Sequence, residues 1–372
     1  MDKRPAPRFD WFIPIDGDGA HIGTRRAERP PTFEYLRRVV EAAEAEGYYS
    51  LLIPTRFANG LFEETAPLAE TWTTVTALAA VTRRIRFLVA VRPGFISTGL
   101  FAQMAAALDQ ISGGRLDINV VPGGIQGDFE RLGVTMDHDK RYEQAEEFIA
   151  ALRALWAKPE PVVFEGSTIR LNGAVVSPGP VGDGPRFYVG GASPRALEFA
   201  AKEADAYLAW IQPLEDTGAL LERLRKAYAA RGRRPVLGLR THLVVRATES
   251  EAWAAAEELM SQVDERVVAQ RQAAFAGTQM VGQQAQLRAQ PRERAPRLWN
   301  GIAKVRVNLG TAIVGDPQQV AAELLAYWRL GFDEFILSGF PHDEECRRVA
   351  SDVLPGLSEA IEREREVPGA QR

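Results

Sequence analysis

The chain has 372 residues, of which 46% are hydrophobic and 25% are charged, and its formal net charge is -4. These values are typical of a soluble globular protein and exclude a disordered chain or a strongly basic nucleic-acid-binding domain. Cys346 is the only cysteine and the four histidines lie far apart, which excludes intrachain disulfides and gives no basis for a metal site. No apolar run approaches the roughly 20 residues of a membrane span, and we expect a cytoplasmic protein.

Short runs rich in β-branched and aromatic residues alternate with longer stretches of helical periodicity along the chain. This alternation predicts βα units and a parallel sheet. Eight short runs are predicted to be strands: Phe9–Pro14, Tyr49–Pro54, Ile85–Val91, Leu116–Val121, Arg186–Val189, Ala206–Leu208, Val236–Val245 and Glu334–Leu337. Eight such units predict an α/β fold of the (β/α)8 TIM-barrel kind with insertions, as a single domain over residues 1–372.

Four stretches between the first strands carry apolar residues at helical spacing: Thr32–Glu46, Ala66–Ala80, Leu100–Ile111 and Tyr142–Ala157. Two other segments depart from the simple alternation. Val162–Leu171, with Gly166 between two β-leaning runs, predicts a hairpin inserted before the fifth strand. Residues 262–303 form a long polar stretch that glycines and prolines interrupt, and we expect this stretch to be an active-site lid.

A cation and an imidazole stand two residues apart in the predicted strand Val236–Val245. In barrels of this kind the active site lies at the carboxyl ends of the strands, and strand alternation places Arg240 and His242 on one face. An unpaired guanidinium in the barrel lumen would be costly to bury, so an anion is expected beside it. That anion is either a ligand or an acidic side chain in a structural ion pair, and the sequence leaves both open.

Two glycine-containing turns are candidate ligand contacts. Gly190–Pro194 follows a predicted strand and opens a helix, where free backbone N–H groups bind phosphate, although a plain N-cap at Ser193 explains the same residues. Asn119, followed by Gly123–Gly124, either lets a flat ring system approach the backbone or marks a tight turn. Both readings stay open for each turn.

A series of short motifs, in this order, resembles the alkanesulfonate monooxygenases of the bacterial luciferase-like flavin monooxygenase family. The resemblance covers nearly the whole chain. Its motifs are Trp11–Pro14, Gly17–Gly19, Gly23–Thr24, Leu52–Thr55, Phe87–Pro93, Asn119–Val121, Gly190–Gly191, Asn300–Gly301, Gly310–Asp316 and Leu337–His342. It implies a two-component enzyme in which a separate NAD(P)H-dependent flavin reductase supplies reduced FMN (FMNH2). With O2, the enzyme then oxidises an organosulfonate to an aldehyde and sulfite. We also expect a homo-oligomer, either a dimer or a tetramer.

The resemblance also assigns site residues position by position. The sulfonate-binding set of the family falls on Trp210, Arg240, His242, Arg306 and His342, with Arg240, His242 and Arg306 as the expected catalytic residues. A sulfonate is a permanent anion with three acceptor oxygens, which suits guanidinium and imidazole donors. The FMN would lie against Ala90, Asn119, Tyr142, Gly191, Ala192 and Ser193. Trp210, Arg306 and His342, each taken alone, are equally well explained as ordinary core or surface residues.

The sequence departs from the family at several of these places. Asp16 stands where the relatives carry a histidine, and the loop Thr55–Gly60 lacks their cysteine. Phe340 replaces a tyrosine next to the sulfonate set, and Pro122 replaces a threonine near the flavin. We expect Asp16 and Phe340 to contact the substrate.

The polar residues Asp16, Asn59, Glu63 and Glu64 follow the first two strands, at the expected mouth of the pocket. They favour a hydroxylated substrate such as sulfoquinovose, which a related branch of the family oxidises, over an alkanesulfonate or methanesulfonate. Solvated loop positions without substrate contact are the alternative. Two other functions remain open, a deazaflavin-dependent oxidoreductase and a non-catalytic flavin-binding protein.

Overall fold

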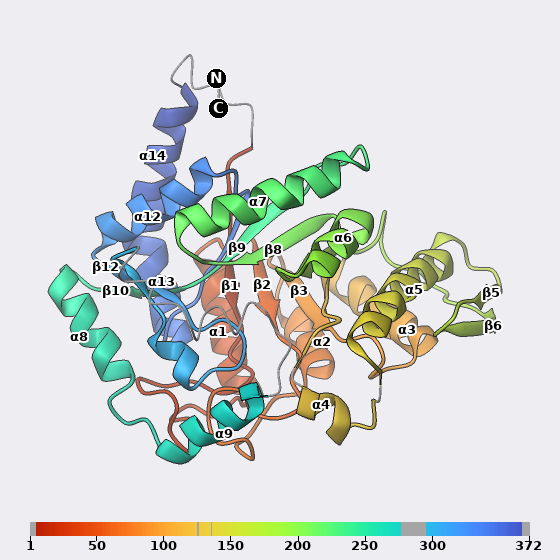
Figure 1. Ribbon diagram of the computed structural model, residues 1–372, viewed down its shortest axis with the longest axis horizontal. Helices are drawn as coiled ribbons and strands as arrows, with labels where there is room; N and C mark the ends of the chain where they lie inside the picture. Colours follow the sequence, from red (N-terminus) through yellow and green to blue (C-terminus); the bar gives the residue numbers. More distant parts are fainter. Residues whose placement is uncertain (1–4, 125, 135, 277–294, 367–372) are drawn as a thin grey trace.

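Eight parallel strands close into a barrel with helices around it (Figure 1), in the order β1-β13-β9-β8-β7-β4-β3-β2. This computed structural model describes residues 5–124, 126–134, 136–276 and 295–366. The barrel strands are β1 (Arg8–Phe12), β2 (Ser50–Ile53), β3 (Arg86–Val91), β4 (Leu116–Val120), β7 (Phe187–Gly190), β8 (Ala206–Trp210), β9 (Val236–Arg240) and β13 (Glu334–Ile336). Each predicted strand overlaps one of them, and the predicted (β/α)8 barrel is confirmed.

The seventh predicted strand is divided into two strands that belong to different sheets. The barrel strand β9 ends at Arg240, and β10 (His242–Val245) pairs instead with β12 (Ala312–Gly315), which also pairs with β11 (Leu298–Trp299). The Thr241 N–H still donates to a carbonyl of β13, whereas the next N–H donates beside β12. The chain therefore leaves the barrel at Thr241, directly after a candidate site residue.

The helices begin at side-chain caps that adjust the predicted boundaries. Glu70 accepts hydrogen bonds from two N–H groups of the first turn of α2, so this helix starts at Thr71 and not at Ala66. The Asp137 side chain accepts from the Lys140 N–H and caps α5, so this helix begins at His138, four residues earlier than predicted. The helices up to α8 are α1 (Phe33–Ala45), α2 (Thr71–Val81), α3 (Thr98–Ser112), α4 (Gln126–Arg131), α5 (His138–Ala157), α6 (Pro194–Glu203), α7 (Leu214–Ala229) and α8 (Glu249–Leu259). Towards the carboxyl terminus follow α12 (Pro317–Arg329), α13 (His342–Asp352) and α14 (Leu354–Glu366).

Two insertions extend the barrel. The predicted hairpin is confirmed as the antiparallel pair β5 (Val162–Glu165) and β6 (Arg170–Ala174), which projects beside α3 and α5 at the right of Figure 1. The expected lid, residues 262–303, is described at its two ends, by α9 (Glu265–Ala276) and the 3-10 turn η1 (Gly301–Lys304). Residues 277–294 lie outside the described residues, so the lid stays a prediction.

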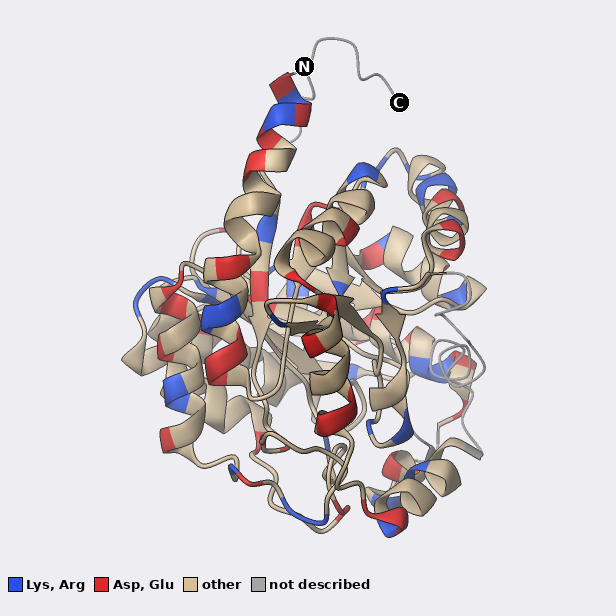
Figure 2. Cartoon of the chain, turned by 90° about the vertical axis from the view of Figure 1, so that its left-hand side faces the viewer, with Lys and Arg blue, Asp and Glu red and all other residues tan. Residues whose placement is uncertain are grey.

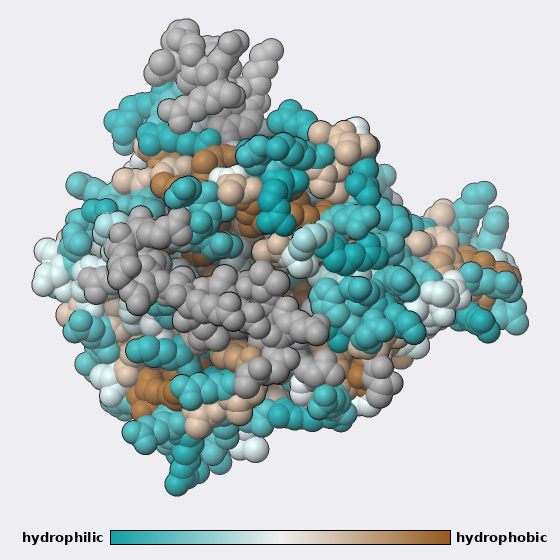
Figure 3. Space-filling model, viewed as in Figure 1, coloured by the Kyte–Doolittle hydropathy of each residue, from teal (hydrophilic) through white to brown (hydrophobic). Residues whose placement is uncertain are grey.

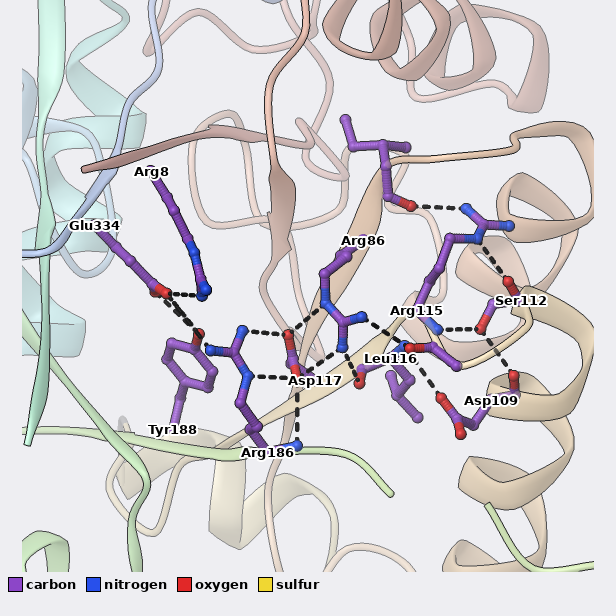
Figure 4. Close-up of polar contacts among 12 residues, drawn as sticks. Arg8, Arg86, Asp109, Ser112, Arg115, Leu116, Asp117, Arg186, Tyr188 and Glu334 are labelled. Carbon is purple, nitrogen blue, oxygen red and sulfur yellow. Dashed lines mark hydrogen bonds and ion pairs between the residues drawn. The ribbon is translucent and has the colours of Figure 1, made fainter. Parts of the chain in front are cut away.

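The barrel lumen is layered from the amino to the carboxyl ends of its strands. Buried ionic side chains fill the amino-terminal end, which Figure 4 shows in close-up, with Asp117 between Arg86 and Arg186. Apolar side chains form the layer above: Phe12, Leu52, Leu88, Tyr188, Ala206, Leu208 and Ile336. These layers close the lumen from below, so a ligand can enter only at the carboxyl ends.

The surface carries mixed charge and scattered apolar side chains. Acidic and basic residues are interspersed on the helices in Figure 2, and hydrophilic residues predominate on the face in Figure 3. A single-signed face of the kind that attracts nucleic acid is therefore not seen among the described residues in this view. No helix within the described ranges has both the length and the apolar character that crossing a membrane requires.

Candidate functional site

A cavity of about 240 Å³ opens at the carboxyl ends of the barrel strands. Its wall comes from the ends of β1, β2, β3, β4, β7, β8 and β9 and from residues 306–309. Nine of the residues singled out in the sequence line this wall: Ala90, Asn119, Tyr142, Gly191, Ala192, Ser193, Trp210, Arg240 and Arg306. Residues from distant parts of the chain thus meet in one pocket.

Arg240 stands at the end of β9 and is only 4% exposed. Its guanidinium donates to the Ser338 hydroxyl at 2.9 Å and lies 4.6 Å from the centre of the Phe12 ring. Burial lowers the pKa of Arg240 well below its usual value, and the charge of Arg306 adds to this effect. The side chain therefore sits in a place that disfavours its own charge.

Arg306 flanks the same aromatic ring, with its guanidinium carbon 5.1 Å from the Phe12 ring centre. Its Nε atom is buried without a hydrogen-bond partner, and burial lowers the pKa of Arg306 to about 9. Within the described residues no carboxylate forms an ion pair with Arg306 or with Arg240. Two buried guanidiniums on one cavity wall, without a carboxylate partner among the described residues, can hold an anionic ligand between them.

His242 lies behind Arg240 and does not line the cavity. Its Nε2 atom bonds the Leu309 carbonyl at 3.2 Å, which requires a proton on Nε2, and its Nδ1 atom lies 2.6 Å from the Ser338 hydroxyl. Burial and the charge of Arg240 lower the pKa of His242, so the ring is neutral and Nδ1 accepts from Ser338. Arg240 and His242 therefore both bond the Ser338 hydroxyl, although Arg240 lines the cavity and His242 does not.

His342 is also set back from the cavity and fully buried. Its Nδ1 atom lies 2.9 Å from a carboxylate oxygen of Asp18, which also accepts from the Tyr35 hydroxyl, while its Nε2 atom is buried without a partner. Phe340 stacks on the His242 ring and meets the His342 ring edge-on. His242, His342 and Phe340 were three of the expected substrate contacts. The structure places all three behind the residues that line the cavity.

Asp16, another expected substrate contact, is 1% exposed and bonded within the protein. One carboxylate oxygen accepts from the Arg56 Nε atom at 2.8 Å, and the other accepts from the Gly60 N–H at 2.7 Å. Asp16 does not line the cavity, whereas Arg56 does. The expectation of a direct substrate contact is thus corrected, because the carboxylate is used by an ion pair.

The three other polar residues of this region are also off the cavity wall. The Asn59 side chain is buried and fully engaged, since its amide donates to two backbone carbonyls and its oxygen accepts from two backbone N–H groups. Glu63 pairs with Arg25, and Glu64 pairs with Arg131. The polar groups of these loop residues are thus engaged within the protein and away from the cavity wall.

Sequence reasoning missed several wall residues. Arg92 directly follows β3 and pairs with Asp128 at 3.2 Å. Arg141, beside a predicted cofactor residue, is buried and its Nε atom has no partner. Phe12 and Asn308 also line the cavity. Position at a strand end was a usable signal for Arg92 and Phe12, but none marked Asn308.

The family assignment follows from the sequence over most of the chain. Residues 8–334 match the profile of the luciferase-like monooxygenases. The chain belongs to this family. The predicted family is therefore confirmed. The match does not single out the alkanesulfonate monooxygenase group within this family.

Solved structures with the same fold as this luciferase-like monooxygenase include proteins that use different cofactors. Riboflavin lyase (RcaE), solved with modified FMN and riboflavin, is 21% identical with a TM-score of 0.79, and the match covers 98% of this chain and 93% of that one. DmoA from Hyphomicrobium sulfonivorans is 19% identical with a TM-score of 0.77, covering 100% and 91%. An F420-dependent secondary alcohol dehydrogenase is 16% identical with a TM-score of 0.69, covering 95% and 99%. These likenesses establish the fold.

The cofactor end of this luciferase-like cavity fits a flavin phosphate. The Tyr142 hydroxyl is hydrogen-bonded to Ser193, and Ser193 also accepts from the Ala196 N–H as the N-cap of α6. Gly191 has φ +128°, and a Cβ there would come within 2.8 Å of Ala196. The glycine therefore permits a close turn at a helix amino terminus, so the N-cap and the anion-binding explanations are compatible.

The ring end offers complementary polar groups. The Asn119 side-chain oxygen is buried without a hydrogen-bond partner and faces a cavity that it helps to line. A ring N–H of an isoalloxazine would satisfy this acceptor. The Ala90 carbonyl is already engaged by Trp72 Nε1 at 3.1 Å. The Asn119 side-chain oxygen could thus accept a hydrogen bond from a flavin.

Proposed function

We propose that this protein uses reduced FMN and O2 to cleave the carbon–sulfur bond of an organosulfonate. The products are an aldehyde, sulfite, oxidised FMN and water, with one oxygen atom of O2 entering the aldehyde and the other the water. The observation that carries the proposal is the pair of buried guanidiniums, Arg240 and Arg306, that lack a carboxylate partner within the described residues. Burying such charges is unfavourable unless a ligand anion compensates them.

The proposed site contains side chains that would touch the sulfonate and a side chain that would act through another residue. Arg240 and Arg306, which both lie close to the Phe12 ring, would bind the sulfonate oxygens, and Trp210 would form the adjoining wall. His242 would act through Ser338, since it holds the hydroxyl that accepts from Arg240. His242 is therefore a positioning residue in this proposal and not a catalytic one.

The bound flavin would supply the activation of oxygen, and the chain would hold it in place. Tyr142, Gly191, Ala192 and Ser193 would bind its phosphate, and Asn119 would bond its ring. Arg141 lies on the same wall and adds positive charge near the phosphate. We propose a separate flavin reductase as the source of FMNH2 and a homo-oligomeric assembly, as the resemblance implies.

We propose a hydroxylated sulfonate such as sulfoquinovose as the substrate, with alkanesulfonates as the alternative. The acidic residues that first favoured it do not line the cavity. Support comes instead from Gln212 and Asn308, whose positions on the wall follow Trp210 and Arg306 by two residues. Amides beside the anion site can bond hydroxyl groups, and such a pocket discriminates against substrates that lack them.

The test is a reconstitution with FMNH2, O2, a flavin reductase and a panel of sulfonates. Sulfite release is measured for sulfoquinovose, octanesulfonate and methanesulfonate under one reductase supply. We expect sulfite release that depends on FMNH2, with the highest kcat/KM for sulfoquinovose. A preference for either alkane would overturn the substrate, and the absence of sulfite from all three would overturn the reaction.

A further inference from the structure

We infer that the buried ion pair of Asp16 and Arg56 is a positioning unit that aims Arg306 into the cavity. This inference rests on the proposed function and deepens it, because it identifies what holds an anion-binding guanidinium that has few bonds of its own. Arg306 is 3% exposed, its Nε atom has no partner, and its backbone N–H donates to Ile302 at 3.0 Å. Its orientation must therefore come from the neighbouring backbone.

Val307, the residue that follows Arg306, is held at both of its backbone polar atoms by the loop after β2. The Val307 N–H donates to the Gly60 carbonyl at 2.9 Å. The Val307 carbonyl accepts from the Arg56 guanidinium at 3.2 Å. Two bonds of opposite direction from one loop fix this residue more firmly than either would alone.

Asp16 fixes the two residues that hold Val307. Its Oδ2 atom accepts from the Arg56 Nε atom at 2.8 Å, and its Oδ1 atom accepts from the Gly60 N–H at 2.7 Å. The Asp16 and Arg56 side chains are 1% and 4% exposed, so solvent does not screen the pair. One buried carboxylate thus organises both contacts to the segment that carries Arg306.

A second buried arginine braces the amino side of the same segment. Arg271, on α9, donates from Nε to the Val305 carbonyl at 3.0 Å and from another nitrogen to the Asn59 carbonyl at 2.9 Å. Burial lowers the pKa of Arg271 to about 10. Arg306 is therefore bracketed by Val305 and Val307, each of which is tied to the loop after β2.

The test compares two substitutions of the same kind at opposite ends of the barrel. Asp16→Asn removes the charge of the positioning carboxylate, and Asp117→Asn does the same to a carboxylate that is also 1% exposed and bonded to arginines and a backbone N–H. Calorimetry measures octanesulfonate binding without turnover. We expect about tenfold weaker binding in Asp16→Asn, and unchanged binding in Asp117→Asn and unchanged FMN affinity in both.

A double-variant cycle separates positioning from general loosening. In an Arg306→Ala background, Asp16→Asn should cause no further loss of octanesulfonate affinity, because its effect acts through the removed guanidinium. Arg271→Lys, which keeps the charge but loses the branched donors, should weaken binding in the same direction if Asp16→Asn does not fold. Equal binding by the wild type and both folded variants would overturn this inference alone. Absence of binding by the wild type to both octanesulfonate and sulfoquinovose would instead overturn the proposed function.

Discussion

Arginines lie at both ends of the barrel, but Arg240 and Arg306, at the carboxyl end, have no carboxylate partner among the described residues. At the amino ends of the strands, Asp117 receives paired hydrogen bonds from both Arg86 and Arg186 (Figure 4). At the carboxyl ends, Arg240 and Arg306 share a cavity wall and bond only neutral groups or nothing. Burial of an arginine alone does not mark a binding site; Arg240 and Arg306 are distinguished because they also line the cavity and have no carboxylate partner among the described residues.

The pKa directions at the two ends show the same difference. Burial disfavours the charge of Arg186, yet its hydrogen bonds to Asp117 raise its pKa overall. Burial lowers the pKa of Arg240, and no carboxylate among the described residues reverses the shift. The carboxylate of Asp117 thus compensates arginine charge at the amino end, while the described residues offer no carboxylate partner to Arg240 and Arg306 in the cavity.

The largest expected effect is on catalysis at the cavity. Arg240→Ala and Arg306→Ala should each lower kcat/KM for desulfonation by about 100-fold or more, since truncating a buried charged partner costs 2 to 5 kcal/mol. FMN affinity should stay unchanged, because these side chains face the substrate. Steady-state kinetics and a fluorescence titration with FMN measure the two quantities. A parallel loss of FMN affinity would contradict the separation of the two ends of the cavity.

The second effect is on stability at the opposite end. Asp117→Ala should lower the free energy of unfolding by about 2 kcal/mol, because Arg86 loses its carboxylate partner and Arg186 is left with the longer contact to Glu334. The KM for the sulfonate should not change in the folded variant. Urea denaturation measures the first quantity and kinetics the second. A changed KM with unchanged stability would reverse the roles assigned to the two clusters.

A smaller effect distinguishes the cofactor end from the arginine pair. Tyr142→Phe should weaken FMN binding about tenfold, the lower end of the range for one hydrogen bond to a charged group, without changing sulfonate affinity. Tyr228→Phe is the matched control, since its buried hydroxyl bonds a backbone carbonyl away from the cavity. The two variants are compared by titration with FMN, and a similar loss in both would argue against phosphate binding at Tyr142.

The smallest effect concerns pH and the one incompletely bonded acid of the amino-terminal cluster. Burial raises the pKa of Asp10 well above 3.8, and one of its carboxyl oxygens has no partner. The folded state therefore binds a proton that the unfolded chain releases, so Asp10 costs stability as pH rises above that value. Asp10→Asn should stabilise the protein by about 1 kcal/mol at pH 7, and the gain should shrink towards pH 4. Thermal unfolding at both pH values checks the sign.

The barrel was predictable because each of its strands buries apolar side chains outward, against the helices, whatever fills the lumen. The pattern failed where that rule does not apply. Val236–Val245 is one apolar run in the sequence, but Thr241 transfers the chain to another sheet. The short strands β11 and β12 were missed because their partners lie far away in the sequence.

The site was only partly predictable. Strand-end position and resemblance brought Arg240, Arg306 and Trp210 to the cavity wall. They could not tell that Asp16 pairs with Arg56, because the two residues lie 40 positions apart in chain order. Whether a strand arginine has a carboxylate partner depends on side chains from other strands, and a single sequence does not show them.

The central claim is that the unpaired arginines select a permanent anion. The most direct test compares octanesulfonate with methyl octyl sulfone, which has a similar chain but no charge, under one supply of FMNH2. We predict sulfite release from the sulfonate and no measurable consumption of the sulfone. Turnover of the sulfone at a kcat/KM equal to or above that of the sulfonate would contradict the account.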